Sequence, residues 1–138
     1  MGKRSVILLG DTENNVEFTG EAVRGDAYFG YKDGLHTVAI YLENFTGRVY
    51  IEATLANEPG DNDWFPINLT GNTDYIEYPL IPNMPTGLTG DTGVDAYSFQ
   101  GNLMFLRARI DKTYITPIPT TPAEEALLGS IRKILLNH

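Results

Sequence analysis

The feature that most constrains the fold of this chain is a two-residue alternation of apolar and more polar side chains between residues 36 and 55. Such a period places one set of side chains on one face of an extended strand. Residues 43–47, which end in Gly47, separate two alternating runs with turn-forming side chains. The expected inward-facing residues are Val38, Ile40 and Leu42 in the first run and Val49, Ile51, Ala53 and Leu55 in the second. The sequence therefore predicts two neighbouring strands joined as a β-hairpin.

A third alternating run follows Gly101 and predicts another strand. Met104, Leu106, Ala108 and Ile110 share one face of this run, and Leu103, Phe105, Arg107 and Arg109 share the other. Shorter apolar runs predict strands at residues 5–9, 27–31, 64–69, 75–78 and 114–118. Short strands without alternating long helices indicate an all-β domain, a β-sandwich or a jelly-roll-like body. We expect Val38, Ile40, Val49, Ile51, Leu106 and Ile110 in its core.

The length and composition fit a single domain over residues 1–138. The chain is 42% hydrophobic, with eight tyrosines, six phenylalanines and one tryptophan. A chain of this length can bury a core without covalent cross-links. It contains no cysteine, which excludes a disulfide scaffold, a thiolate zinc site and a cysteine nucleophile.

Two segments do not follow the strand pattern. Residues 79–95 are rich in proline and glycine and predict a long loop, which we interpret as a candidate assembly arm. Its apolar side chains are Leu80, Ile81, Met84 and Leu88. In the C-terminal segment 121–138, Thr121, Pro122 and Glu124 match a capping box and predict at most one short helical turn near residues 122–128. The pattern of residues 130–136 fits either a closing strand or a second helical piece.

The charge distribution bears on the partners of the chain. The formal net charge is −8, with 15 acidic and 5 basic residues in 1–101 and 3 acidic and 5 basic residues in 102–138. A negative surface opposes binding to phosphate backbones, so we expect no nucleic acid partner. We interpret Arg107, Arg109, Lys112, Arg132 and Lys133 as solvated sides of strands rather than a basic patch. The apolar run at residues 6–9 is too short for a signal peptide or a membrane helix, and we expect neither.

The sequence carries no recognised catalytic or metal-binding motif. It has no G-x-S-x-G, no G-x-G-x-x-G and no P-loop. The chain has two histidines, His36 and the terminal His138. We interpret His36 as a turn or strand-edge residue. The acidic segments 61–63 and 91–95 do not match a calcium loop, and we interpret them as turns. We therefore expect no enzyme activity, no metal and no cofactor.

The only tryptophan provides an alternative. Trp64 follows Asp61 and Asp63, and an exposed aromatic ring beside carboxylates is how β-sandwich modules bind sugar rings. If Trp64 faces solvent, these three residues predict a carbohydrate-binding site. If Trp64 is buried or lies in an interface, protein assembly is favoured.

Four segments, in order, carry a resemblance to a known family. They are residues 45–55 (FTGRVYIEATL), 63–67 (DWFPI), 101–108 (GNLMFLRA) and 129–138 (GSIRKILLNH). Together they resemble small virion structural proteins of tailed bacteriophages, particularly myoviruses of marine cyanobacteria. The resemblance spans residues 19–138 and includes no catalytic signature. It implies a β-rich particle component, and it favours a strand over residues 130–136.

We therefore predict a non-enzymatic virion subunit that acts through contacts with copies of itself and with other virion proteins. It would be made in the host cytoplasm and serve in capsid decoration, the neck, the tail or fibre attachment. A homo-oligomer is expected, with a trimer or another ring as the first guess. The candidate assembly contacts are Leu80, Ile81, Met84, Leu88, Arg107 and Arg109. The alternative is a carbohydrate-binding module at a receptor-binding site.

Overall fold

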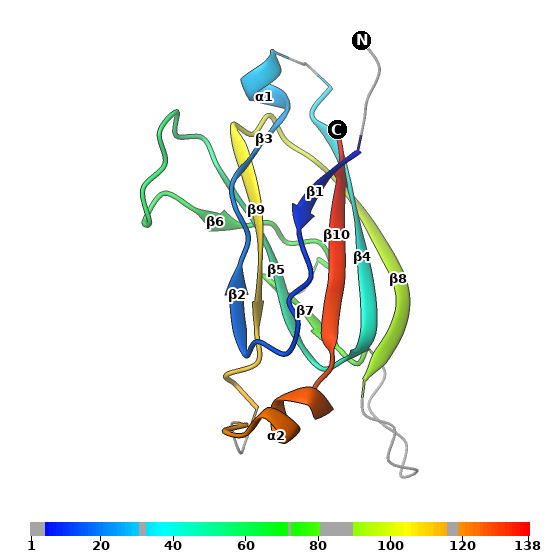
Figure 1. Cartoon of the computed structure of the whole chain (residues 1–138). Helices are drawn as coiled ribbons and strands as arrows, with labels where there is room; N and C mark the ends of the chain where they lie inside the picture. The colour runs from blue at the N-terminus through cyan, green and yellow to red at the C-terminus, as the bar shows by residue number, and fades with distance from the viewer. Residues whose placement is uncertain (1–4, 31–32, 72, 81–89, 116–118) are drawn as a thin grey trace.

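Two antiparallel β-sheets pack face to face and form a β-sandwich (Figure 1). The computed structural model describes the chain except residues 1–4, 31–32, 72, 81–89 and 116–118. Two short helices lie at opposite ends of the sandwich, α1 (Asp26–Phe29) and α2 (Pro122–Leu127). The all-β fold expected from the alternation is confirmed.

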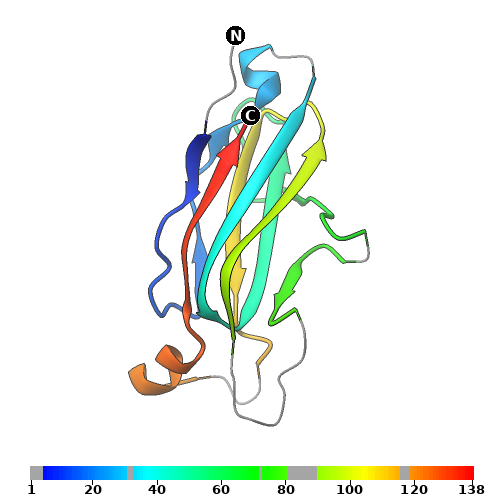
Figure 2. The ribbon, with the colours of Figure 1, turned by 90° about the vertical axis from the view of Figure 1, so that its right-hand side faces the viewer.

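The first sheet has the strand order β1-β10-β4-β8. Its strands are β1 (Ser5–Leu9), β10 (Ser130–Asn137), β4 (Leu35–Phe45) and β8 (Asp91–Gln100), shown side by side in Figure 2. The C-terminal strand β10 lies inside the sheet between β1 and β4. The segment at 130–136 is therefore a strand, as the resemblance favoured.

The second sheet has the order β2-β9-β5-β6, with β3 also paired to β9 and β7 to β5. Its strands are β2 (Glu17–Thr19), β3 (Val23–Arg24), β5 (Gly47–Thr54), β6 (Phe65–Pro66), β7 (Ile76–Tyr78) and β9 (Phe105–Asp111). β5 and β9 form the long central pair, in which Ile51 lies opposite Ala108. The remaining strands are short, and they pair with only part of the outer edges of β5 and β9.

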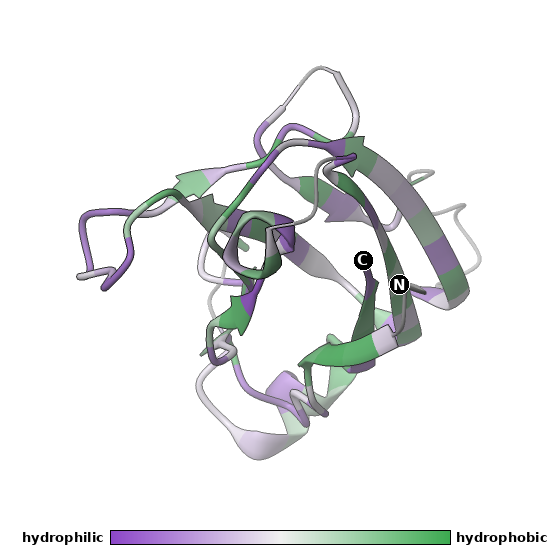
Figure 3. Cartoon of the chain, turned by 90° about the horizontal axis from the view of Figure 1, so that it is seen from above, coloured by the Kyte–Doolittle hydropathy of each residue, from purple (hydrophilic) through white to green (hydrophobic). Residues whose placement is uncertain are grey.

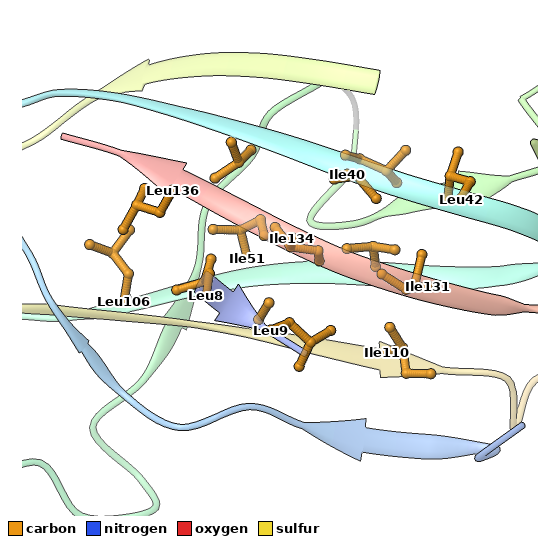
Figure 4. Packing of buried hydrophobic residues seen from close by; sticks show 14 of the residues in the cluster. Leu8, Leu9, Ile40, Leu42, Ile51, Leu106, Ile110, Ile131, Ile134 and Leu136 are labelled. Atoms are coloured by element: carbon orange, nitrogen blue, oxygen red, sulfur yellow. The ribbon is translucent and has the colours of Figure 1, made fainter. Parts of the chain in front are cut away.

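The core lies between the two sheets. Val38, Ile40, Val49, Ile51, Leu106 and Ile110 are each at most 1% exposed. Leu8 and Leu9 of β1 and Ile131, Ile134 and Leu136 of β10 complete the same cluster (Figure 4). Seen from above, hydrophobic and hydrophilic bands alternate along the strands (Figure 3). The six expected core positions are confirmed.

The predicted β-hairpin between residues 36 and 55 is wrong in its pairing. β4 and β5 are both strands, but β4 pairs with β10 and β8, and β5 pairs with β6, β7 and β9. The chain crosses from one sheet to the other at Asn44–Gly47, where Asn44 has φ +50°. Phe45 turns into the core there, at 0% exposure. A Cβ on Gly47 would lie 2.8 Å from the Phe45 ring, so this crossing needs a glycine.

Residues 27–31 were expected to form a strand, but residues 27–29 belong to helix α1, and residue 31 lies outside the described residues. Gly25 precedes the helix, and Gly30 ends it in the left-handed conformation at φ +77°. The backbone amides of Gly25 and Ala27 donate to Met104 and Leu103, which holds this turn against the start of β9. The chain thus has a second short helix besides the predicted one, α2, whose capping box between Thr121 and Glu124 is present.

Other predicted boundaries also shift. The loop expected over 79–95 is shorter, because Asp91–Asp95 belongs to β8 and pairs with Phe45–Ile40 of β4. The predicted strand at 64–69 is confined to β6, and that at 75–78 begins at Ile76. Residues 114–115 are not in a strand, and 116–118 lie outside the described residues.

Candidate functional site

The outer face of β5 and β9 carries a layer of arginine, glutamate and aromatic side chains. Glu52 of β5 lies directly opposite Arg107 of β9. Arg107 Nε donates to Glu52 Oε1 at 2.8 Å, and Arg109 Nε donates to Oε2 at 3.4 Å. Glu52 is only 8% exposed, so these charges interact in a partly desolvated setting.

Aromatic rings cover the guanidinium groups of this layer. The Arg107 guanidinium lies 4.3 Å from the Trp64 ring centroid, and that of Arg109 lies 3.9 Å from Tyr50. Cation–π contacts of this kind add to the ion pairs. The predicted assembly contacts Arg107 and Arg109 are therefore brought together, but both have partners within the chain. Within the chain, Trp64 and Tyr50 are the aromatic neighbours of these two arginines.

The predicted sugar-binding residues do not form a ready platform. Trp64 is partly buried, and the Arg107 guanidinium lies over its ring. Asp63 Oδ2 accepts a hydrogen bond from the Gly60 amide at 2.7 Å, which closes a tight turn. Asp61 is exposed in the same turn. Trp64 is of intermediate exposure and therefore meets neither arm of the criterion, so assembly and sugar binding both stay predictions.

The predicted assembly arm lies largely outside the described residues. Ile81, Met84 and Leu88 fall within 81–89 and stay predictions. Leu80 is described and is 51% exposed. Its amide donates to Asp91 Oδ2 at 2.8 Å, so this acidic residue fixes the base of the segment.

Strand β8 is a long open edge of the first sheet. All of its described backbone pairing is with β4, from Gln100 opposite Leu35 to Asp91 opposite Phe45. Its ten residues include no lysine, arginine or proline. Lysine and proline are among the residues with which proteins block sheet edges, and an edge without them is a template for pairing with another chain; the charged residues of β8 are Asp91 and Asp95.

The outer face of the first sheet carries an apolar row that crosses all four strands. Ile7, Leu135, Ala39 and Ala96 lie opposite one another in that order. Ile7 is 62% exposed, and Val94, on the same side of β8 as Ala96, is 56% exposed. The next row is polar, with Thr37 Oγ1 and Ser98 Oγ 2.9 Å apart. This face combines a flat apolar surface with the open edge of β8.

The five basic residues of the C-terminal part do not form one patch. Arg132 and Lys133 are exposed, as expected. Lys112 is 0% exposed, which corrects its interpretation as a solvated side chain. Its Nζ donates to the Gly129 carbonyl at 2.8 Å, and burial lowers its pKa to about 8.

A buried cluster of ionisable residues lies at the α1 end of the sandwich, and the sequence analysis missed it. Asp26, His36 and His138 are 0%, 0% and 4% exposed. His138 Nδ1 lies 3.2 Å from Asp26 Oδ1, and His36 Nε2 lies 3.7 Å from the same oxygen. His36 does begin a strand, as predicted, but it is buried beside two partners far away in sequence. No spacing motif joins these three positions, so only the fold reveals them.

Comparison with family models, with curated proteins and with solved structures found no match. The resemblance to virion proteins therefore stays an expectation from the sequence. Within the described part of the chain, no helix is long and apolar enough to cross a membrane.

Proposed function

We propose that this chain is a non-enzymatic structural subunit that assembles with copies of itself through the open edge of β8. The observation that carries this proposal is the ten-residue β8 strand, whose described pairing is all with β4. Backbone amide and carbonyl groups along such an edge can be satisfied by a second strand.

The other described edges are less suited to pairing. β1 has five residues and a register irregularity between Ile7 and Leu9. β2, β3, β6 and β7 have only two or three residues each. A long edge is thus concentrated on β8, whose pairing with β4 is regular from Gly93 to Gln100.

A second copy of the chain is the simplest partner for β8. Two β8 strands related by a twofold axis pair antiparallel and join two four-stranded sheets into one of eight. The apolar row then continues from one copy into the next, because Ala96 is its last member in each. A ring would instead need β8 to pair with β1 of the next copy, and β1 is half as long. The twofold pair is therefore favoured over the ring first expected.

A tailed-phage particle is the setting that the resemblance suggests. Subunits of such particles are joined by repeated contacts between copies, which an open edge and an apolar sheet face can supply. The net charge of −8 supports solubility of the free subunit and opposes association. Salt should therefore strengthen pairing, because it screens this repulsion.

The mass of the purified protein in solution tests the proposal. Light scattering at micromolar concentration should give twice the 15.3 kDa of one chain, with a larger dimer fraction at higher salt. Val94→Glu places one negative charge on β8 of each copy, close to the twofold axis. The repulsion between these two charges should weaken association about tenfold. Ile7→Glu is the matched control, because it makes the same kind of exchange on the same sheet face at the opposite edge.

Three outcomes would contradict the proposal. The first is a wild-type protein that stays monomeric up to high micromolar concentration. The second is a Val94→Glu variant with the same mass in solution as the wild type. Equal weakening by both variants would replace the twofold pair with a β8–β1 contact or a face-to-face contact. Labelling of this subunit on purified phage particles tests the virion setting separately.

A further inference from the structure

Three side chains from distant parts of the chain meet at one end of the sandwich. Asp26 is on α1, His36 is near the start of β4, and His138 directly follows β10 (Figure 1). One carboxylate oxygen and one nitrogen from each histidine all lie within 4.8 Å of one another. Burying ionisable groups is costly unless a bound charge or hydrogen bonds compensate for the lost water.

The tautomer of His36 follows from its contact with Gly34. His36 Nδ1 lies 2.8 Å from the Gly34 carbonyl oxygen, which can only accept. Nδ1 therefore carries a proton, and Nε2 of the neutral ring is the nitrogen with a lone pair. That nitrogen faces Asp26 Oδ1 at 3.7 Å. A nitrogen lone pair and a carboxylate oxygen thus lie beside each other in the interior, and both are donor types that a metal cation takes.

The two histidine contacts of Asp26 Oδ1 differ in length: His138 Nδ1 is within hydrogen-bond distance at 3.2 Å, and His36 Nε2 is farther away. A separation of 3.7 Å between His36 Nε2 and Asp26 Oδ1 is too long for a hydrogen bond. Ligand atoms on a tetrahedral zinc ion, each about 2.0–2.1 Å from it, lie about 3.3 Å apart. The 3.2 Å and 3.7 Å separations at Asp26 Oδ1 bracket this value.

We propose that Asp26, His36 and His138 bind one Zn²⁺ ion that fastens the end of β10 to α1 and β4. Imidazole nitrogens and a carboxylate suit zinc, and a water molecule would complete the four-coordinate geometry of these three protein ligands. Two neutral imidazoles and one carboxylate leave the ion with only one net positive charge. The role assigned to the ion is structural, because it joins positions 112 residues apart in sequence.

A metal-binding histidine usually donates a hydrogen bond from its second ring nitrogen, and His36 makes such a bond. The hydrogen bond from Nδ1 to the Gly34 carbonyl orients the His36 ring and directs Nε2 at the carboxylate. Gly34 has φ +63°, and a Cβ there would lie 3.0 Å from Gly101, so only glycine places this carbonyl without strain. The Phe99 ring stacks on His36 with centroids 5.0 Å apart.

His138 gives the cluster contact with solvent. It lines an open pocket of about 310 Å³ together with Val6, Ala22, Val23, Arg24 and Phe29. This pocket provides a route by which an ion reaches the ligands. Such a route is needed because Asp26 and His36 are themselves fully buried.

The test uses the untagged full-length chain, because a histidine tag would bind zinc itself. After chelator treatment and dialysis, calorimetry with zinc chloride should give one ion per chain with a Kd below 1 µM. A hundredfold excess of zinc over Kd should raise the Tm by about 10 °C. Cobalt should bind at the same site with the visible absorption of a tetrahedral complex.

Asp26→Asn keeps the shape of the side chain but makes a poor ligand, and it should weaken zinc binding at least tenfold. His138→Gln provides a second ligand variant, read by cobalt absorption, in case Asp26→Asn fails to fold. The matched control is Asp61→Asn with Asp63→Asn, which removes two exposed carboxylates and should leave binding unchanged.

The proposal is overturned if the wild-type chain shows no one-to-one binding and its Tm does not move with zinc. In that case the cluster is held by hydrogen bonds alone. It is also overturned if the ligand variants bind zinc as the wild type does, or if the Asp61/Asp63 variant abolishes binding.

Discussion

Ala96 of β8 lies opposite Ala39 of β4, and on the other side of Ala96 no described residue continues the sheet. Among the described residues, the sheet therefore ends in a strand that is ten residues long, is regularly paired from Gly93 to Gln100, and is free of lysine, arginine and proline. Both alanines belong to an apolar row that begins at Ile7 on the opposite edge. This combination of open edge and apolar row is the basis of the proposed assembly.

Ile51 tests the assignment of the core face. It is 1% exposed at the centre of β5, and Ile51→Ala should lower the free energy of unfolding by about 2–5 kcal/mol. Urea denaturation measures this loss. The control is Ile7→Ala, whose side chain is 62% exposed and whose effect should stay within about 0.5 kcal/mol. A loss below about 0.5 kcal/mol for Ile51→Ala would show that the face is wrongly assigned.

The Glu52–Arg107 pair should contribute more to stability than an exposed ion pair. Its side chains are 11% and 22% exposed, with N and O 2.8 Å apart. A double-mutant cycle with alanine should give a coupling free energy of about 1–2 kcal/mol. The comparison pair is Arg48–Glu77 at 2.9 Å, whose carboxylate is 48% exposed and whose coupling should be about 0.5 kcal/mol or less. Equal couplings in the two cycles would contradict this ranking.

Lys112 should make stability rise with pH above about 8. Burial lowers its pKa from 10.5 to about 8, while Glu125 acts in the opposite direction. The unfolded chain therefore binds more protons than the folded chain between these two values, and the cost of burying the charge falls as pH rises. Between about pH 7.5 and 9.5 the free energy of unfolding should increase by about 2 kcal/mol.

The same titration has a control and an upper limit. Lys112→Met should remove most of the rise with pH, whatever its effect on stability at a single pH. Above pH 10 the trend should reverse, because burial raises the pKa values of Tyr78, Tyr97 and Tyr114 and the folded state keeps their protons. A flat wild-type profile from pH 7.5 to 9.5 would contradict the account of Lys112.

Alternation predicted the strands and the core but not the pairing of β4 with β5. Ile40 and Ile51 point into the same core from opposite sheets, and a period of two looks the same for strands side by side and strands facing each other. The deciding feature is Phe45, whose burial at the crossing turns the chain from one sheet to the other.

The sequence did not reveal strand β8 or the cluster of Asp26, His36 and His138, for different reasons. Asp91, Gly93 and Asp95 are typical turn residues, and only pairing with β4 makes this segment a strand. Asp26, His36 and His138 have no characteristic spacing, because three separate elements bring them together. Arg107 and Arg109, named from the sequence as candidate assembly contacts, interact within the chain with Glu52, Trp64 and Tyr50, and their role in assembly stays a prediction.

The most direct test of the assembly claim is backbone amide exchange of β8 as a function of protein concentration. Pairing of two β8 edges protects amides that face away from β4, so exchange within Asp91–Gln100 should slow about tenfold between mostly monomeric and mostly dimeric samples. β2 (Glu17–Thr19), an edge of the other sheet, should exchange at the same rate in both. Association detected by light scattering without slower exchange in β8 would contradict the claim that this edge joins the subunits.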